Sequence, residues 1–140
     1  MKKLFIFLLF LPLLLSASQQ EYEIKILSAI ADALFPNTRV VKVWTDTQKN
    51  IIFLKNIKKV QTVSSIEEAE ILFLTKDNDI ESNKMKFVTS YQLLKRYKST
   101  TLGGFYWKKG RPNILFIREN LIKYNKTLPA SMSKYIEDDL

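Results

Sequence analysis

Basic and aromatic side chains gather in one short stretch of the chain, and their chemistry suits binding. Tyr106 and Trp107 lead directly into Lys108 and Lys109, and Arg111 follows after a glycine. Tyrosine, tryptophan and arginine are enriched among the residues that carry the binding energy of protein interfaces. We therefore predict that these side chains form a contact surface for an acidic partner. The alternative is a solvated turn on a hairpin of the core.

A second basic cluster precedes this stretch. Lys95, Arg96 and Lys98 lie close in sequence to two aromatic residues, Tyr91 and Tyr97. Basic and aromatic groups together can also bind nucleic acid, through phosphate contacts and base stacking. The first residues of the chain predict export, and an exported protein meets little nucleic acid. We therefore expect no nucleic-acid partner. Membrane phosphates, cell-wall anions or an acidic protein face are the expected partners.

The acidic residues do not form a convincing catalytic or metal site. Glu67 and Glu68 fit the first turn of a helix, where the helix dipole favours carboxylates. The run Asp77-Asn78-Asp79 superficially resembles a calcium loop, but the glycine and the terminal glutamate that such a loop requires are missing at their spacing. We predict no metal site and no catalytic carboxylate pair.

The composition narrows the possible chemistry further. The chain has no histidine and no cysteine, which removes the commonest metal ligands, the usual base of a catalytic triad and any thiol nucleophile. Its glycines, Gly103, Gly104 and Gly110, are too few for a dinucleotide-binding or phosphate-binding loop. We therefore expect a non-enzymatic binding protein without a cofactor.

The first residues have the layout of a secretory signal peptide. Lys2 and Lys3 precede an apolar run over residues 4–15, and the small residues Ser16, Ala17 and Ser18 follow. The run contains a proline and is shorter than the roughly 20 residues that span a bilayer. We predict a signal peptide over residues 1–18 and one domain over residues 19–140, in the periplasm or secreted. Removing both lysines lowers the net charge from +8 to +6.

Local patterns predict alternating helices and strands. Residues 21–35 carry apolar positions every three or four residues, as in an amphipathic helix that ends at Pro36. Residues 51–54 are ambiguous: Asp46 or Thr47 can cap a helix there, but β-branched and aromatic content favours a buried strand. The other expected elements are strands at 38–45, 59–63, 71–74 and 85–89, a capped helical turn after Ser64 or Ser65, a loop at 75–84, and a helix at 91–98 capped by Ser90.

The last third of the chain predicts a hairpin and two short helices. Apolar runs at 102–107 and 114–117 flank a loop in which Gly110 can take positive φ and Pro112 should stop strand pairing. Helices are expected at 119–124 and 131–136, and a frayed acidic end at Asp138 and Asp139. Together these elements indicate an α/β fold: a layered single domain with a mixed sheet and a C-terminal β-hairpin followed by short helices.

Several small features follow one another in order along residues 66–135. They are an apolar strand at 71–74, a strand that leads into Thr89-Ser90, the pair Gly103-Gly104, an aromatic strand, the turn glycine Gly110, a strand at 114–117, then Asn120, Leu128 and Ser131. In this pattern the chain resembles the YfiR-like family of periplasmic regulators. Family members often carry cysteines, and their asparagine usually follows the last strand directly, whereas Asn120 lies three positions beyond Ile117.

The resemblance implies a periplasmic protein that restrains a membrane-bound diguanylate cyclase through its extracytoplasmic region. It carries over no catalytic residue, because the activity of the family is binding. We therefore expect an exported regulator of a membrane signalling protein. The alternative is a periplasmic binder of a small anionic ligand, held in a cleft near Gly103 and Gly104 at the edge of the sheet.

Overall fold

The protein folds around one mixed β-sheet. Its computed structural model describes the backbone of residues 2–140 and the side chains of residues 18–140. The sheet has the strand order β2-β1-β3-β4-β5-β6-β7. The strands are β1 Val41–Thr45, β2 Val60–Thr62, β3 Ile71–Leu74, β4 Lys86–Val88, β5 Thr101–Lys108, β6 Arg111–Ile117 and β7 Ile136–Glu137. The pairs from β2 to β5 along this order are parallel, β5 and β6 pair antiparallel, and β6 and β7 are parallel. The expected α/β fold with a mixed sheet is therefore confirmed.

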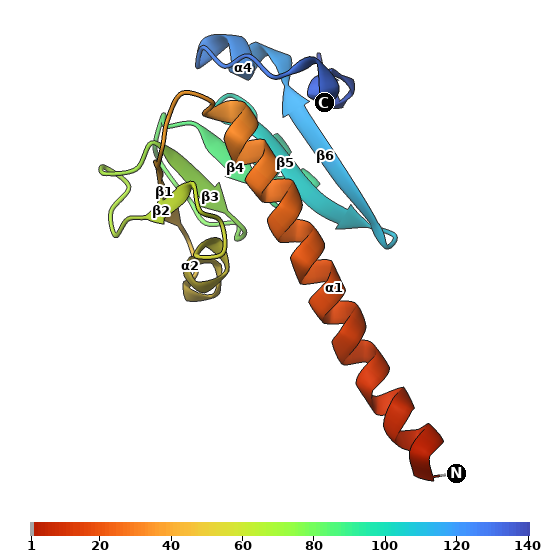
Figure 1. The fold of residues 1–140 in the computed structure, drawn as a ribbon. Coiled ribbons are helices and arrows are strands. Elements are labelled where there is room, and N and C mark those ends of the chain that lie inside the picture. The colour runs from red at the N-terminus through yellow and green to blue at the C-terminus, as the bar shows by residue number, and fades with distance from the viewer. Residues whose placement is uncertain (1) are drawn as a thin grey trace.

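Helices cover both faces of the sheet. Helices α1 (Lys2–Leu34) and α2 (Gln48–Leu54) pack on one face, where Leu27, Ile30 and Leu54 join a common apolar core. Helix α3 (Tyr91–Arg96) packs on the other face through Leu93 and Leu94. In Figure 1, α1 crosses the sheet diagonally and its N-terminal half extends beyond the turn between β5 and β6. Within the described residues, no helix combines enough length and apolar character to cross a membrane.

The remaining helices lie at the opposite end of the molecule from the turn between β5 and β6 (Figure 1). They are α4 (Arg118–Lys123) and a 3-10 helix, η1 (Ala130–Tyr135). Asn120 of α4 is buried, and its side-chain amide donates to the carbonyl oxygens of Lys98 and Thr101, both at 2.7 Å. This asparagine therefore ties α4 to the start of β5.

The strand predicted at residues 51–54 is wrong, because these residues form the end of α2. Thr47 caps the helix by accepting a hydrogen bond from the Asn50 backbone N–H at 3.0 Å. Of the four apolar residues only Leu54 is buried, and Ile52 is 59% exposed. A strand buried on both faces would cover all of them, as β3 does.

No helix forms after Ser64 and Ser65, which corrects a second expectation. The segment makes a hydrogen-bonded turn in which the Ala69 N–H donates to the Ile66 carbonyl at 3.1 Å. The Lys84 ammonium donates hydrogen bonds to the carbonyl oxygens of Ile66, Glu67 and Ala69 at 2.6–2.7 Å. The Ile66 carbonyl thus accepts from both the Ala69 N–H and the Lys84 ammonium, and Lys84 links this single turn to the segment before β4.

The hairpin turn is tighter than expected. Lys109 and Gly110 alone connect the strands, with φ of 53° and 74°, as in a type I′ turn. Pairing continues to Lys108 opposite Arg111, so Pro112 does not stop it. In a two-residue hairpin the pair next to the turn exchanges hydrogen bonds, and the following pair does not. Pro112 sits in that following pair opposite Trp107, where its missing N–H is not needed by β5.

The acidic C-terminus follows a short edge strand and makes two exposed ion pairs. Strand β7 pairs parallel with β6 at the edge of the sheet. Asp138 then pairs with the Arg118 guanidinium at 2.5 Å, and Asp139 lies 3.4 Å from the Lys98 ammonium. The short helix expected at residues 131–136 is present as η1, a 3-10 helix that ends at Tyr135, and Ile136 begins β7.

Candidate functional site

The predicted partner-binding residues separate onto two faces of the hairpin. Trp107 faces α1, where its indole Nε1 donates to Glu23 Oε1 at 2.6 Å and its ring lies 6.1 Å from that of Tyr22. Tyr106 faces α3, with its ring 6.4 Å from that of Tyr91. Successive side chains of a strand point to opposite faces. Trp107 is therefore half-buried under α1 and does not share a surface with Tyr106.

The basic residues of the turn belong with Tyr106. Lys108 lies opposite Arg111 in the strand register, on the same face as Tyr106, and Lys109 occupies the turn itself. All three basic side chains are exposed. Within the described part of the chain, none of them forms an ion pair with a carboxylate.

The second basic cluster is mostly neutralised. Arg96 pairs with Asp79 and, at 2.8 Å, with Asp77, and Lys98 pairs with Asp139. Lys95 differs, because its ammonium lies 5.4 Å from the centre of the Tyr91 ring. The two aspartates of the supposed calcium loop thus bind an arginine. Among the described residues, no group of three or more acidic side chains is arranged to hold a metal ion.

What remains is one continuous surface beside α3. We call it the tyrosine–basic surface and define it by Tyr91, Lys95, Tyr106, Lys108 and Arg111. Tyr91 is 40% exposed although it is aromatic, and its ring links the helix to the hairpin through Tyr106. Lys95 lies over the Tyr91 ring, and Lys108 and Arg111 follow Tyr106 on the same face of the hairpin. None of these cations has a carboxylate partner among the residues described. The arrangement can bind an acidic surface.

The two glycines expected beside a ligand cleft lie inside the sheet. Gly103 and Gly104 are buried in β5, which has β4 on one side and β6 on the other, so a cleft at the sheet edge is wrong for them. A methyl group on Gly103 would collide with the Leu115 carbonyl and the Phe116 side chain. On Gly104 it would lie 2.9 Å from the Val88 carbonyl oxygen. Both glycines allow close packing of neighbouring strands.

A cavity that the sequence analysis missed opens at the carboxyl ends of the parallel strands. It has a volume of about 210 Å³ and lies between α1, α2 and β5. Its apolar wall consists of Leu27, Phe53, Phe73, Phe105 and Trp107. A hollow of about 410 Å³ between α1 and α2 shares Phe53 with it.

Polar groups complete the cavity. Thr75 and Thr89 are the first residues after β3 and β4, and Lys49, Asn50 and Glu23 line the same space. Ligands of open α/β sheets bind outside the carboxyl ends of the strands, where the strand order reverses. Threonines directly after two apolar strands are the signal in the sequence from which this edge could have been predicted.

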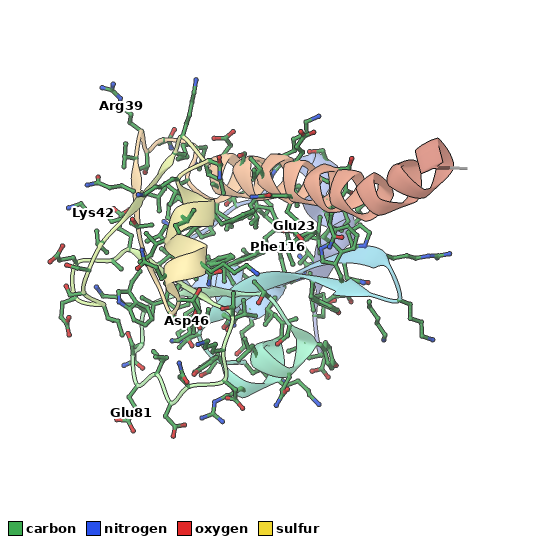
Figure 2. The ribbon with its side chains drawn as sticks, turned by 90° about the horizontal axis from the view of Figure 1, so that it is seen from below. Glu23, Arg39, Lys42, Asp46, Glu81 and Phe116 are labelled. Carbon is green, nitrogen blue, oxygen red and sulfur yellow. The ribbon has the colours of Figure 1, made fainter. Side chains whose placement is uncertain are left out.

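Asp46 fixes the rim of the cavity where the strand order reverses between β1 and β3. Its Oδ2 accepts from the backbone N–H groups of Thr75 at 2.8 Å and Lys76 at 2.7 Å. Its Oδ1 accepts from the Thr75 hydroxyl at 3.0 Å and the Asn50 amide at 3.2 Å. Figure 2 shows Asp46 beside α2 and Glu23 on the side of α1 that faces the sheet.

One lysine is completely buried away from this cavity. The Lys86 ammonium donates to the carbonyls of Ser82 at 2.6 Å and Lys84 at 3.0 Å, and to the Thr100 hydroxyl at 2.9 Å. None of these acceptors carries a charge. Burial, and to a lesser extent the nearby positive charge of Lys123, lower the pKa of Lys86 from 10.5 to about 8. Because its side chain is inaccessible, its role is structural.

A scan against models of known protein families finds no match, and a search of curated proteins finds no matching relative. The residues behind the YfiR-like resemblance include Gly103, Gly104 and Asn120, which all have packing or hydrogen-bonding roles in this fold.

Proposed function

We propose that this chain is an exported, non-enzymatic protein that regulates a membrane signalling protein, such as a diguanylate cyclase, by binding its extracytoplasmic region. The observation that carries the proposal is the tyrosine–basic surface. Its aromatic rings are clustered and accessible, and its cations have no carboxylate partners among the described residues. The surface is therefore complementary to an acidic protein face.

The chemistry of this surface favours a protein partner. Tyrosine buries a large apolar area while its hydroxyl group keeps a hydrogen-bonding site. Cations at the rim of an interface raise the association rate with an acidic face and exclude basic competitors. The hairpin holds the backbone of Tyr106, Lys108 and Arg111 in a fixed register, so the backbone loses little conformational entropy when they bind.

Location and partner class come from the sequence. The leader-like residues 1–18 support export, and the YfiR-like pattern supports a membrane signalling protein as the partner. The side chains of residues 1–17 lie outside those that the structure describes, so the signal peptide stays a prediction. A partner at the membrane surface would also suit the net charge of +6 that the mature chain would carry.

The proposal is tested by affinity capture from a detergent-solubilised envelope, followed by mass spectrometry. The bait is the mature chain in three forms: the native sequence, the double variant Lys108→Glu/Arg111→Glu, and the control Lys55→Glu/Lys58→Glu. The control changes the net charge equally at exposed lysines near the end of α2. We expect one membrane signalling protein with the native and control baits. Its affinity for the hairpin variant should fall at least about tenfold. Equal capture by all three forms would refute the tyrosine–basic surface as the contact site.

A further inference from the structure

The cavity at the carboxyl ends of the parallel strands has a lining that points to a second activity, independent of the protein partner. Its position is the one at which open α/β sheets bind small molecules. The rim is held in place, because Asp46 links the end of β1 to the start of the segment after β3. Asn50 adds hydrogen bonds from α2 to Thr45 and Thr75, both at 3.0 Å. A preformed site of this kind binds a ligand without first having to order its own walls.

The apolar wall of the cavity indicates that the ligand carries an apolar group. Phe105 and Trp107 meet edge to face with ring centres 6.0 Å apart, and Phe53 lines the same space. Aromatic walls favour a flat or otherwise apolar group. The volume of about 210 Å³ suits a single small molecule.

The opposite charges of Glu23 and Lys49 indicate that the ligand carries both a positive and a negative group. Glu23 and Lys49 both line this cavity and the adjoining hollow, yet they are not paired within 4.0 Å. Glu23 uses Oε1 to accept from Trp107, and its Oε2 has no hydrogen-bond partner among the described residues. Lys49 likewise forms no ion pair within the part of the chain described. The carboxylate of Glu23 would repel a simple anion at the same site.

We propose that this cavity binds a small zwitterion of the amino-acid class with an aromatic or other apolar side chain. The ligand carboxylate would lie near the Lys49 ammonium, the ligand ammonium near Glu23 Oε2, and the side chain against Phe105 and Trp107. Thr89 adds a further polar side chain to the lining, whereas the Thr75 hydroxyl already donates to Asp46. A molecule with both charges can pair with the half-buried Glu23 and with Lys49, whose side chain is exposed.

Tryptophan fluorescence gives a direct test. Trp44 and Trp107 are the two tryptophans, so Trp44→Phe leaves Trp107 as the sole reporter at the cavity. The mature Trp44→Phe protein is titrated with L-phenylalanine, with 3-phenylpropanoate, which lacks the amine, and with 2-phenylethylamine, which lacks the carboxylate. We expect saturable changes and an affinity for phenylalanine about tenfold or more above either analogue. Absence of saturation with every probe, or equal affinities for the three, would overturn the proposal.

Charge variants assign the two ends of the ligand. In Lys49→Met the advantage of phenylalanine over 2-phenylethylamine should disappear, because the group that recognises the carboxylate is gone. In Glu23→Gln the advantage over 3-phenylpropanoate should disappear, while the glutamine oxygen can still accept from Trp107. Lys55→Met, at an exposed lysine just after α2, is the matched control and should bind as the parent does. Unchanged preferences in both cavity variants would refute the assignment even if binding occurred.

Discussion

Lys86 carries a charge into the core without a carboxylate to balance it. The acceptors around its ammonium are two carbonyl oxygens and a hydroxyl, which solvate the cation but do not neutralise it. Together with Lys84, it binds the segments at 64–70 and 82–84 to the sheet through backbone oxygens. Hydrogen bonds to charged donors are stronger than neutral ones, so these lysines organise loops that have no regular structure.

The low pKa of Lys86 makes its contribution to stability depend on pH. Between pH 8 and pH 10.5 the unfolded chain keeps a proton on this lysine that the folded chain has released. The free energy of unfolding should therefore rise with pH in this window. We expect native protein to gain about 1 to 2 kcal/mol relative to Lys86→Met between about pH 8 and pH 9.5. Urea unfolding at each pH measures the difference. The exposed-site control Lys55→Met should show no such trend, and a flat difference for Lys86→Met would contradict the prediction.

Asp46 is the second residue whose substitution should lower the stability of the whole protein. Asp46→Ala would remove four hydrogen bonds, two from backbone N–H groups and two from the Thr75 hydroxyl and the Asn50 amide. We expect the free energy of unfolding to fall by about 2 to 4 kcal/mol, because hydrogen bonds to a charged acceptor are lost together. Asp32→Ala is the comparison, since Asp32 is 70% exposed and forms a single ion pair with Lys59. That variant should lose less than about 1 kcal/mol, and equal losses would argue against the network.

At the scale of elements, the close approach of β5 to its neighbours depends on Gly103. Gly103→Ala should destabilise the protein by about 2 kcal/mol or more, because the added methyl group meets backbone that cannot move without breaking the ladder. Gly110→Asn is the control: its surroundings are open, and asparagine tolerates the positive φ of 74°. It should change stability by less than about 0.5 kcal/mol. Chemical denaturation of both variants gives the comparison, and a tolerated Gly103→Ala would show that the strands can move apart.

The observed helices and strands agree with the prediction where the sequence contains a single local signal. Ser90 caps α3 as expected, and its hydroxyl accepts from the Leu93 N–H at 3.1 Å. At residues 51–54 two signals competed, a helix cap at Thr47 and a β-branched run. The cap prevailed because α2 lies at the molecular surface with Ile52 in solvent. Burial decides between a helix cap and a β-branched run, and burial is known only once the chain has packed.

At the scale of the whole molecule, the predicted leader and the folded domain should be separable. The described buried side chains of α1 begin at Leu27, well after Ser18. We expect exported protein to begin at Gln19, as measured by its intact mass, and to unfold in one cooperative transition. Recovery of protein that retains residues 1–18 would contradict the predicted cleavage.

The helix that remains after cleavage should still be essential to the core. In the mature chain, Leu27→Ala should lower the free energy of unfolding by about 2 to 4 kcal/mol, because Leu27 lies in the main apolar cluster. Lys25→Ala, at an exposed position of the same helix, should change it by less than about 0.5 kcal/mol. A small loss for Leu27→Ala would show that α1 packs less firmly than the structure indicates.

The sequence by itself determined the α/β class, most strands and the hairpin, because these depend on short-range preferences: apolar runs, caps and turn residues. Tertiary structure alone decided which groups meet. Asp46 and Thr75 are 29 positions apart, yet together they form the rim of the cavity. Glu23 accepts a hydrogen bond from Trp107, 84 positions away, and this contact places Trp107 under α1 and not on the predicted partner-binding surface. Contacts at such separations form only when the strands pair and the helices pack, so no local pattern in the chain encodes them.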